Sequence, residues 1–224
     1  MLQAGSIPIG CDVSERRLFR VLKLFALSVG FLMPAIRDVQ AEGFSFFPAM
    51  AQVANIASGD TLNVRAEASG SSADLGDLAS GEQIEVLGLN ADGRWAHIIW
   101  QEGNGWVATR YLAPASRPAS DSGLPLNLTC IGNEPFWSLK LDNSTQADFE
   151  IAGEMPDHLS LEWSGTSRNV GLAAYGFSGP AVSGVLRRAE CSDGMSDRTY
   201  GWSVDVVLRD GPMSQLYSGC CVGR

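Results

Sequence analysis

Four cysteines in the second half of the chain carry the clearest covalent chemistry: Cys130, Cys191, Cys220 and Cys221. A zinc site would need histidine partners or a CxxC spacing, and neither accompanies them. A bond between the neighbours Cys220 and Cys221 would be strained, and on a strand their side chains point to opposite faces. An even number of cysteines is typical of disulfides when a chain is exported. We therefore expect two disulfides, in which Cys130 and Cys191 each bond one member of the final pair.

Three acidic residues near these cysteines could support glycoside hydrolysis, which uses a pair of carboxylates. Glu134 follows the first cysteine, and Asp193 and Asp197 follow the second. The alternative is that the aspartates form turns by bonding local backbone groups. A serine nucleophile would have to recruit His158, yet no G-x-S-x-G turn is present, and an oxidised cysteine has no thiolate. We favour the turn-forming role and predict no catalytic residue, no metal and no cofactor.

The overall composition is that of a globular protein with an acidic balance. The 224 residues include 16 Lys and Arg against 25 Asp and Glu, which gives a net charge of −9. Nucleic-acid binding requires clustered basic residues that displace counterions from phosphates. We therefore expect no nucleic-acid partner.

The N-terminal segment has the tripartite pattern of a secretory signal peptide. Basic residues precede an apolar run from Leu24 to Ile36, and small residues at Val39 and Ala41 follow it. The run is shorter than the roughly 20 residues that span a bilayer, so cleavage after Ala41 is favoured over an uncleaved anchor. Cleavage removes five basic and three acidic residues and changes the net charge from −9 to −11. We expect a periplasmic or secreted bacterial protein that has no membrane association after cleavage.

A segment rich in Ser, Ala and Pro divides the remaining chain into two halves. Its sequence, ASRPASDSG at residues 115–123, has no apolar periodicity and is typical of a linker. All four remaining cysteines follow it, which favours two independent domains. The predicted organisation is a signal peptide at 1–41, an extension at 42–52, a first domain at 53–114, a linker at 115–126 and a second domain at 127–224.

The first half consists of short alternating runs separated by glycine-containing turns. The runs are Thr61 to Ala66, Gln83 to Leu89, Arg94 to Trp100 and a strand that resumes at Trp106. The turns contain Gly and Asn, which tolerate positive φ, and no helical pattern of useful length appears. We expect a small all-β barrel of about five strands.

The motifs of this half resemble the bacterial SH3 (SH3b) domain over residues 53–114. The similarity rests on the L-N-V-R motif at 62–65, Trp95, and the G-W-V motif at 105–107 followed by Tyr111 and Leu112. Ala68-Ser69 replaces the usual Pro-Ser of the family. The resemblance implies a non-enzymatic module, often attached to cell-wall enzymes, whose better understood members bind peptidoglycan or its peptide cross-bridges.

Aromatic residues of this half are the candidates for ligand binding. Trp95 and Trp100 lie on opposite faces of one strand, and both faces cannot be solvated. We predict a site that includes Asn63, Trp95, Trp100 and Tyr111. By contrast, we assign Trp106 to the barrel core, and we expect Arg65 to brace the barrel through backbone carbonyls and the lone His97 to be packed or on the surface.

The second half shows the same pattern of strands and turns. Its expected strands are Phe136–Leu141, Ala147–Ile151, Leu159–Trp163, Val182–Arg187 and Trp202–Leu208. They predict an antiparallel barrel or sandwich whose last strand is joined by disulfides to its first strand and to the Cys191 loop. The motifs G-N-E-P-F-W at 132–137 and M-S-D at 195–197, with a terminal G-C-C, resemble a group of exported bacterial proteins and lipoproteins of little assigned function.

Together these features predict a non-enzymatic, all-β cell-envelope binding protein. Its first domain would recognise peptidoglycan or an envelope protein or peptide. The alternatives are a protein-interaction or lysozyme-inhibitor-like role of the second domain, favoured by an acidic charge that would attract cationic wall-cleaving enzymes, and hydrolysis by Glu134 with a nearby aspartate.

Overall fold

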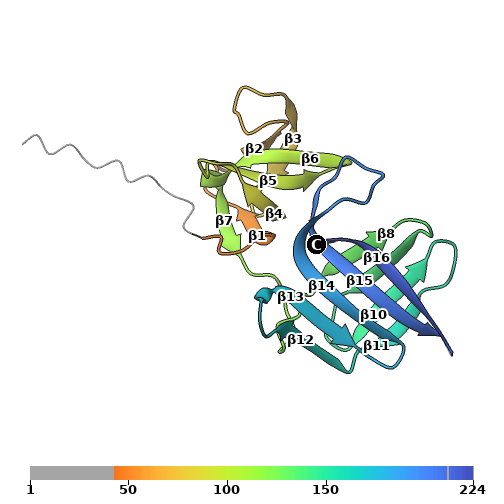
Figure 1. Ribbon diagram of the computed structural model, residues 1–224. Coiled ribbons are helices and arrows are strands. Elements are labelled where there is room, and N and C mark those ends of the chain that lie inside the picture. Colours follow the sequence, from red (N-terminus) through yellow and green to blue (C-terminus); the bar gives the residue numbers. More distant parts are fainter. Residues whose placement is uncertain (1–42, 211, 224) are drawn as a thin grey trace, which may run out of the picture. The chain divides into compact units, whose positions relative to one another are not determined.

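The computed structural model describes residues 43–210 and 212–223, which fall in one compact unit (Figure 1). The predicted signal peptide at 1–41 lies outside the described residues. Two antiparallel sheets make up nearly all of the structure, so the prediction of an all-β fold is confirmed. Among the described residues, no helix has the length and hydrophobicity of a membrane span.

The first sheet contains seven strands in the order β3-β2-β6-β5-β4-β1-β7, followed in the figure from orange to green (Figure 1). A short 3-10 helix, η1 (Thr109–Tyr111), precedes the last strand. The strands are β1 (Ala49–Val53), β2 (Thr61–Arg65), β3 (Asp74–Ala79), β4 (Gln83–Leu89), β5 (Trp95–Trp100), β6 (Gly103–Ala108) and β7 (Leu112–Ala115).

The number of strands exceeds the expected five because some of them have weak sequence signals. β3 contains two aspartates and a glycine, which are rare in strands, and β7 contains Pro114, which is tolerated because β7 is an edge strand. β1 pairs with both β4 and β7, so the sheet begins at Ala49, within the segment predicted as an extension.

The core of the first sheet is entirely aliphatic. The positions of these core residues follow from strand alternation, because Ala96 and Ile98 of β5 and Val107 of β6 point inward. The buried cluster comprises Ala51, Val53, Leu62, Val64, Leu78, Val86, Ala96, Ile98, Val107 and Leu112. The aromatic rings of this half lie at the margin of the cluster or outside it.

The second sheet contains nine strands in the order β11-β10-β9-β8-β16-β15-β14-β13-β12. They are β8 (Leu128–Gly132), β9 (Trp137–Leu141), β10 (Gln146–Ile151), β11 (Asp157–Ser160), β12 (Trp163–Ser167), β13 (Gly171–Ser178), β14 (Val182–Cys191), β15 (Tyr200–Asp210) and β16 (Met213–Gly223). Each strand pairs with its neighbour in sequence except across the β11–β12 junction, and β16 returns to pair with β8. The sheet is therefore a meander curled into a barrel.

The predicted strand Leu159–Trp163 is in fact the junction between β11 and β12. The backbone N–H of Leu161 donates to Thr145, next to β10, and that of Glu162 donates to Ser178 of β13. The chain thus changes pairing partners at these two residues. Because all ladders are antiparallel, β11 and β12 run in the same direction and act as one bent strand, which gives the barrel eight strands in effect.

The core of the second sheet is rich in aromatic rings. Trp137 stacks on Phe149 with ring centroids 5.7 Å apart, and Tyr217 contacts both rings. Trp202 is fully buried. An eight-stranded barrel has an interior wide enough for such side chains.

Two disulfides close this barrel, as predicted. Cys130 of β8 bonds Cys221 of β16, its partner in the ladder, and Cys191 at the end of β14 bonds Cys220. They join the first strand to the last and the last strand to the Cys191 loop. The bonds span 91 and 29 residues, for which loop entropy predicts stabilisation of about 4 to 5 and about 3 to 4 kcal/mol.

Candidate functional site

Asn63 and Trp100, two of the four predicted binding residues, lie beside β3. The Asn63 amide donates to the Asp74 carboxylate at 2.6 Å and thereby lowers the pKa of Asp74. The Trp100 indole donates to the carbonyl of Leu75 at 3.2 Å. Its ring covers Gly76, where φ is +144° and an added Cβ would come within 2.7 Å of the ring. Trp100 therefore closes the margin of the core beside β3.

Trp95 and Tyr111 lie at the other end of β5. Ala108, the ladder partner of Trp95, directly precedes the η1 turn that carries Tyr111. The Arg110 guanidinium lies 4.5 Å from the centre of the Tyr111 ring. Trp95 and Tyr111 are both half-buried, so each presents part of its ring to solvent.

The four predicted residues therefore form two pairs. Trp95 and Trp100 stand at opposite ends of β5 and on opposite faces, about 17 Å apart at the strand rise of 3.4 Å per residue. Tyr111 packs against the core cluster but is only half-buried, as is Trp95, so both rings keep exposed surface. Trp100 is hydrogen-bonded to β3.

Trp106 is not in the barrel core, contrary to the prediction. It is half-buried and stacks on His97 of the neighbouring strand, with ring centroids 4.7 Å apart. Its neighbour Val107 fills the core instead and is fully buried. The sequence does not show which residues of β6 point inward, because both neighbours of Trp106 are apolar or small. Arg65 does bond the carbonyl of Ser72, as expected.

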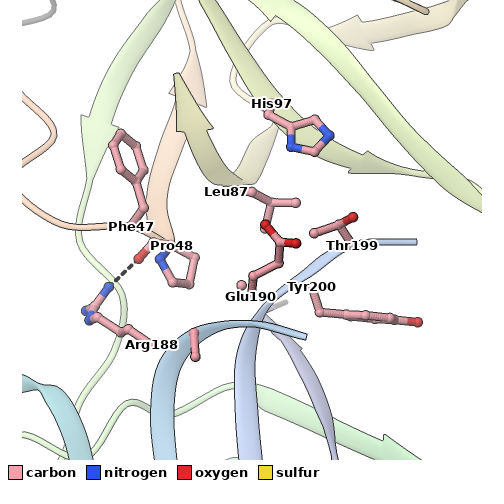
Figure 2. A pocket seen from close by; sticks show the side chains of 10 residues that line it. Phe47, Pro48, Leu87, His97, Arg188, Glu190, Thr199 and Tyr200 are labelled. Atoms are coloured by element: carbon pink, nitrogen blue, oxygen red, sulfur yellow. Dashed lines mark hydrogen bonds between the residues drawn. The ribbon is translucent and has the colours of Figure 1, made fainter. Parts of the chain in front are cut away.

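A small hollow lies beside the His97 ring (Figure 2). Its volume is about 180 Å³, below the roughly 300 Å³ of typical small-molecule sites, and its lining includes Pro48, Leu87, Arg188, Glu190 and Tyr200. Arg188 donates to the carbonyl of Pro48, drawn as a dashed line in Figure 2. Burial lowers the pKa of His97 and Glu190 opposes that shift, so His97 is neutral at pH 7.

Glu85 is a buried acid that no motif in the sequence marks. Its side chain is 3% exposed and forms an ion pair with Arg117, whose side chain is 10% exposed. The same carboxylate accepts from the Trp202 indole at 3.3 Å and from the Gly223 backbone N–H at 3.0 Å. Burial raises the pKa of Glu85, while Arg117 acts in the opposite direction. These contacts join β4 to β15 and β16, and Arg117 lies within the predicted linker.

A larger hollow lies on the second sheet, at the G-N-E-P-F-W motif. We call it the Phe136 pocket. Its volume is about 280 Å³, and its lining consists of Ile131, Gly132, Asn133, Phe136, Trp137, Ser138, Glu150 and Ala152. The Phe136 side chain is 54% exposed, whereas Trp137 is buried beneath the hollow. Apolar groups and a few polar side chains are thus combined as in many ligand sites.

Asp193 organises the loop that follows Cys191. Burial opposes its ionisation, but hydrogen bonds from the Ser196 and Met195 backbone and from the Ser196 and Tyr200 hydroxyls outweigh this effect and lower the pKa to about 2. Such a carboxylate suits a turn and cannot act as a general acid near pH 7. The geometry therefore supports the turn-forming role of Asp193.

Neither the described histidines nor the acidic residues assemble a metal site. His158 bonds Asp148 at 2.7 Å on the surface of the barrel. Within residues 43–210 and 212–223, no group of three or more His, Cys, Asp and Glu side chains could hold a metal ion.

Comparison with known proteins identifies the first sheet. Residues 60–113 match the family model described as bacterial SH3 domain. A stretch of 62 residues, 28% of the chain, is 45% identical to a protein of Bacillus subtilis (strain 168) named "Putative N-acetylmuramoyl-L-alanine amidase YrvJ". The chain spans 12% of the length of that relative. Residues 60–113 are therefore a bacterial SH3 domain, as predicted, and the similarity concerns this one module.

Proposed function

We propose that this chain is a non-enzymatic, exported cell-envelope protein whose bacterial SH3 domain binds peptidoglycan or an envelope peptide. The observation that carries the proposal is the similarity of this module to a segment of a protein whose name refers to a muramoyl-alanine amidase. Because the matched stretch covers 12% of that relative, the similarity supports a shared module and imports no hydrolytic activity.

The export of the chain is supported by its cysteine chemistry. Both disulfides are formed in the second sheet, and disulfides persist in oxidising compartments such as the periplasm or the extracellular space. The predicted signal peptide at residues 1–41 is consistent with the same destination.

The ligand surface that we favour is the end of the first sheet that carries Trp95 and Tyr111. Rigid, half-buried aromatic rings supply apolar contact area at low entropic cost and keep polar edges for hydrogen bonds. Trp100 and Asn63 are already engaged by β3. We therefore expect Trp95 and Tyr111 to contribute most of the binding.

Sedimentation of the full chain with purified peptidoglycan tests this proposal. Binding should weaken at least tenfold in Trp95→Ala or Tyr111→Ala, because buried aromatic anchors dominate interfaces. Phe46→Ala is the matched control, since Phe46 is an exposed aromatic residue outside the predicted site. Equal sedimentation of all four proteins, or none above that of an acidic protein of similar size, would refute wall binding through this surface.

The second sheet could instead act by binding a protein. The Phe136 pocket, which is lined by apolar groups and by Glu150, favours this alternative. An inhibitor of lysozyme-like enzymes should lower lysozyme turnover when the full chain is in excess, and unchanged turnover would exclude that role.

A further inference from the structure

The Phe136 pocket places one carboxylate beside an apolar surface. Glu150, Ser138 and Ile131 are consecutive ladder partners across β10, β9 and β8, so their side chains point to the same face of the sheet. Glu150 is half-buried, and Phe136 and Ala152 complete the apolar part of the lining. A ligand in this hollow would contact hydrocarbon at one end and a negative charge at the other.

The polar groups of the pocket include three hydrogen-bond acceptors. The Asn133 amide nitrogen donates to the carbonyl of Asp193 at 2.5 Å, and its amide oxygen is an acceptor. The Glu150 carboxylate accepts only, and the Ser138 hydroxyl can accept as well. These acceptors are complementary to a ligand group that carries several hydrogen-bond donors and a positive charge.

The pocket is held rigidly although it lies on the surface. Trp137 packs against Gly132 and Gly219, and a Cβ at Gly219 would come within 2.8 Å of its ring. The Ala152 N–H donates to the carbonyl of Phe136 at 2.9 Å. The disulfide of Cys130 secures β8 beside the pocket. A rigid surface loses little conformational entropy when a ligand binds.

From these observations we infer that the Phe136 pocket binds a lysine side chain of a peptide partner. The aliphatic stem packs against Ile131 and Phe136, and the ammonium, which has three donors and no acceptor, bonds the Glu150 carboxylate and its neighbouring acceptors. The net charge of −9 attracts such a basic partner. This inference goes beyond wall binding, specifies the protein-binding alternative at the Phe136 pocket and rests on the second sheet alone.

Titration of the full chain with the peptide acetyl-Gly-Lys-Gly-amide, followed by NMR, tests the inference. Backbone resonances of Ile131 and Ser138 should shift, and a norleucine peptide, which keeps the stem and lacks the ammonium, should bind at least tenfold more weakly. Glu150→Gln should weaken lysine binding about tenfold and remove the preference over norleucine. Phe136→Ala should weaken both peptides.

Two controls separate this inference from other effects. Glu162→Gln removes an exposed carboxylate outside the pocket and should leave lysine binding within twofold. Trp95→Ala, in the bacterial SH3 domain, should also leave it unchanged, so that a failure of wall binding is recognised separately. Equal binding of the two peptides, an unaffected Glu150→Gln variant, or no shifts at millimolar peptide would each overturn the inference.

Discussion

The two sheets differ in where they place their aromatic residues. The core of the first sheet contains only aliphatic side chains, and its tryptophans and Tyr111 lie at the margin or outside. The larger second barrel takes Trp137, Phe149 and Trp202 into its core and adds two disulfides. A small barrel has little room for large rings, so the same residue type lies at the margin of one core and inside the other.

The largest expected effect concerns the covalent closure that only the second sheet possesses. Replacing Cys130 and Cys221 together by alanine should lower the free energy of unfolding by about 4 to 5 kcal/mol, because the bond closes the longer loop. Replacing Cys191 and Cys220 should cost about 3 to 4 kcal/mol. Urea denaturation of the oxidised proteins measures both values, and the reverse order would contradict the loop-entropy explanation.

Glu85 tests whether the two sheets depend on one another. Glu85→Leu removes the acceptor of the buried Arg117 guanidinium and of the Trp202 indole and should cost about 3 kcal/mol. The double variant Glu85→Leu, Arg117→Leu should lose less, because it removes both charges. Far-ultraviolet circular dichroism and tryptophan fluorescence during denaturation report the loss. A double variant that is less stable than the single one would show that the ion pair itself is stabilising.

The pH dependence of stability should have opposite signs at Glu85 and Asp193. The pKa of Asp193 is lowered to about 2, so its contribution is complete above pH 3.8 and is lost as the pH falls toward 2. Solvent screening limits it to about 1 to 2 kcal/mol, which Asp193→Asn should remove at pH 7. The pKa of Glu85 is raised. Its ionisation therefore lowers the free energy of unfolding as the pH rises above 4.5. Denaturation curves from pH 2 to 7 distinguish the two.

The smallest expected effect distinguishes surface from core in β6. Trp106→Ala removes the stacking on His97 and should cost about 1 kcal/mol, although Trp106 is larger than its neighbour Val107. Val107→Ala removes buried methyl groups from a filled core and should cost about 2 kcal/mol. Thermal denaturation compares the two variants, and a greater loss for Trp106→Ala would restore its assignment to the core.

Strand alternation predicted much of the fold, and its failures have physical causes. β2, β4, β5 and β15 contain enough branched and aromatic residues to be recognised. β13 is rich in Gly, Ala and Ser, so pairing with its neighbours stabilises it more than its own propensity does. That Cys220 and Cys221 take different partners was predictable because adjacent strand residues face opposite ways. Which partner each one takes depends on the pairing of β16 with β8.

The site was less predictable because its partners are distant in sequence. The partners of Glu85 are Arg117, Trp202 and Gly223, which lie 32, 117 and 138 positions further along the chain. An acid in a strand ordinarily faces solvent. The Phe136 pocket unites residues of β8, β9 and β10, and only the curled sheet brings them together. The G-N-E-P-F-W motif stands out in the sequence, but its place in a pocket wall depends on the ladder register.

The pairing of β8 with β16 constrains how the second barrel is assembled. Its first strand, β8, pairs with β9 on one side and finds its second partner only in β16, so the β8–β16 ladder and the Cys130–Cys221 bond cannot form until β16 has been synthesised. Contacts between such distant residues slow folding. The barrel therefore stays open until β16 is available, and formation of the Cys130–Cys221 bond marks the completion of its ladder.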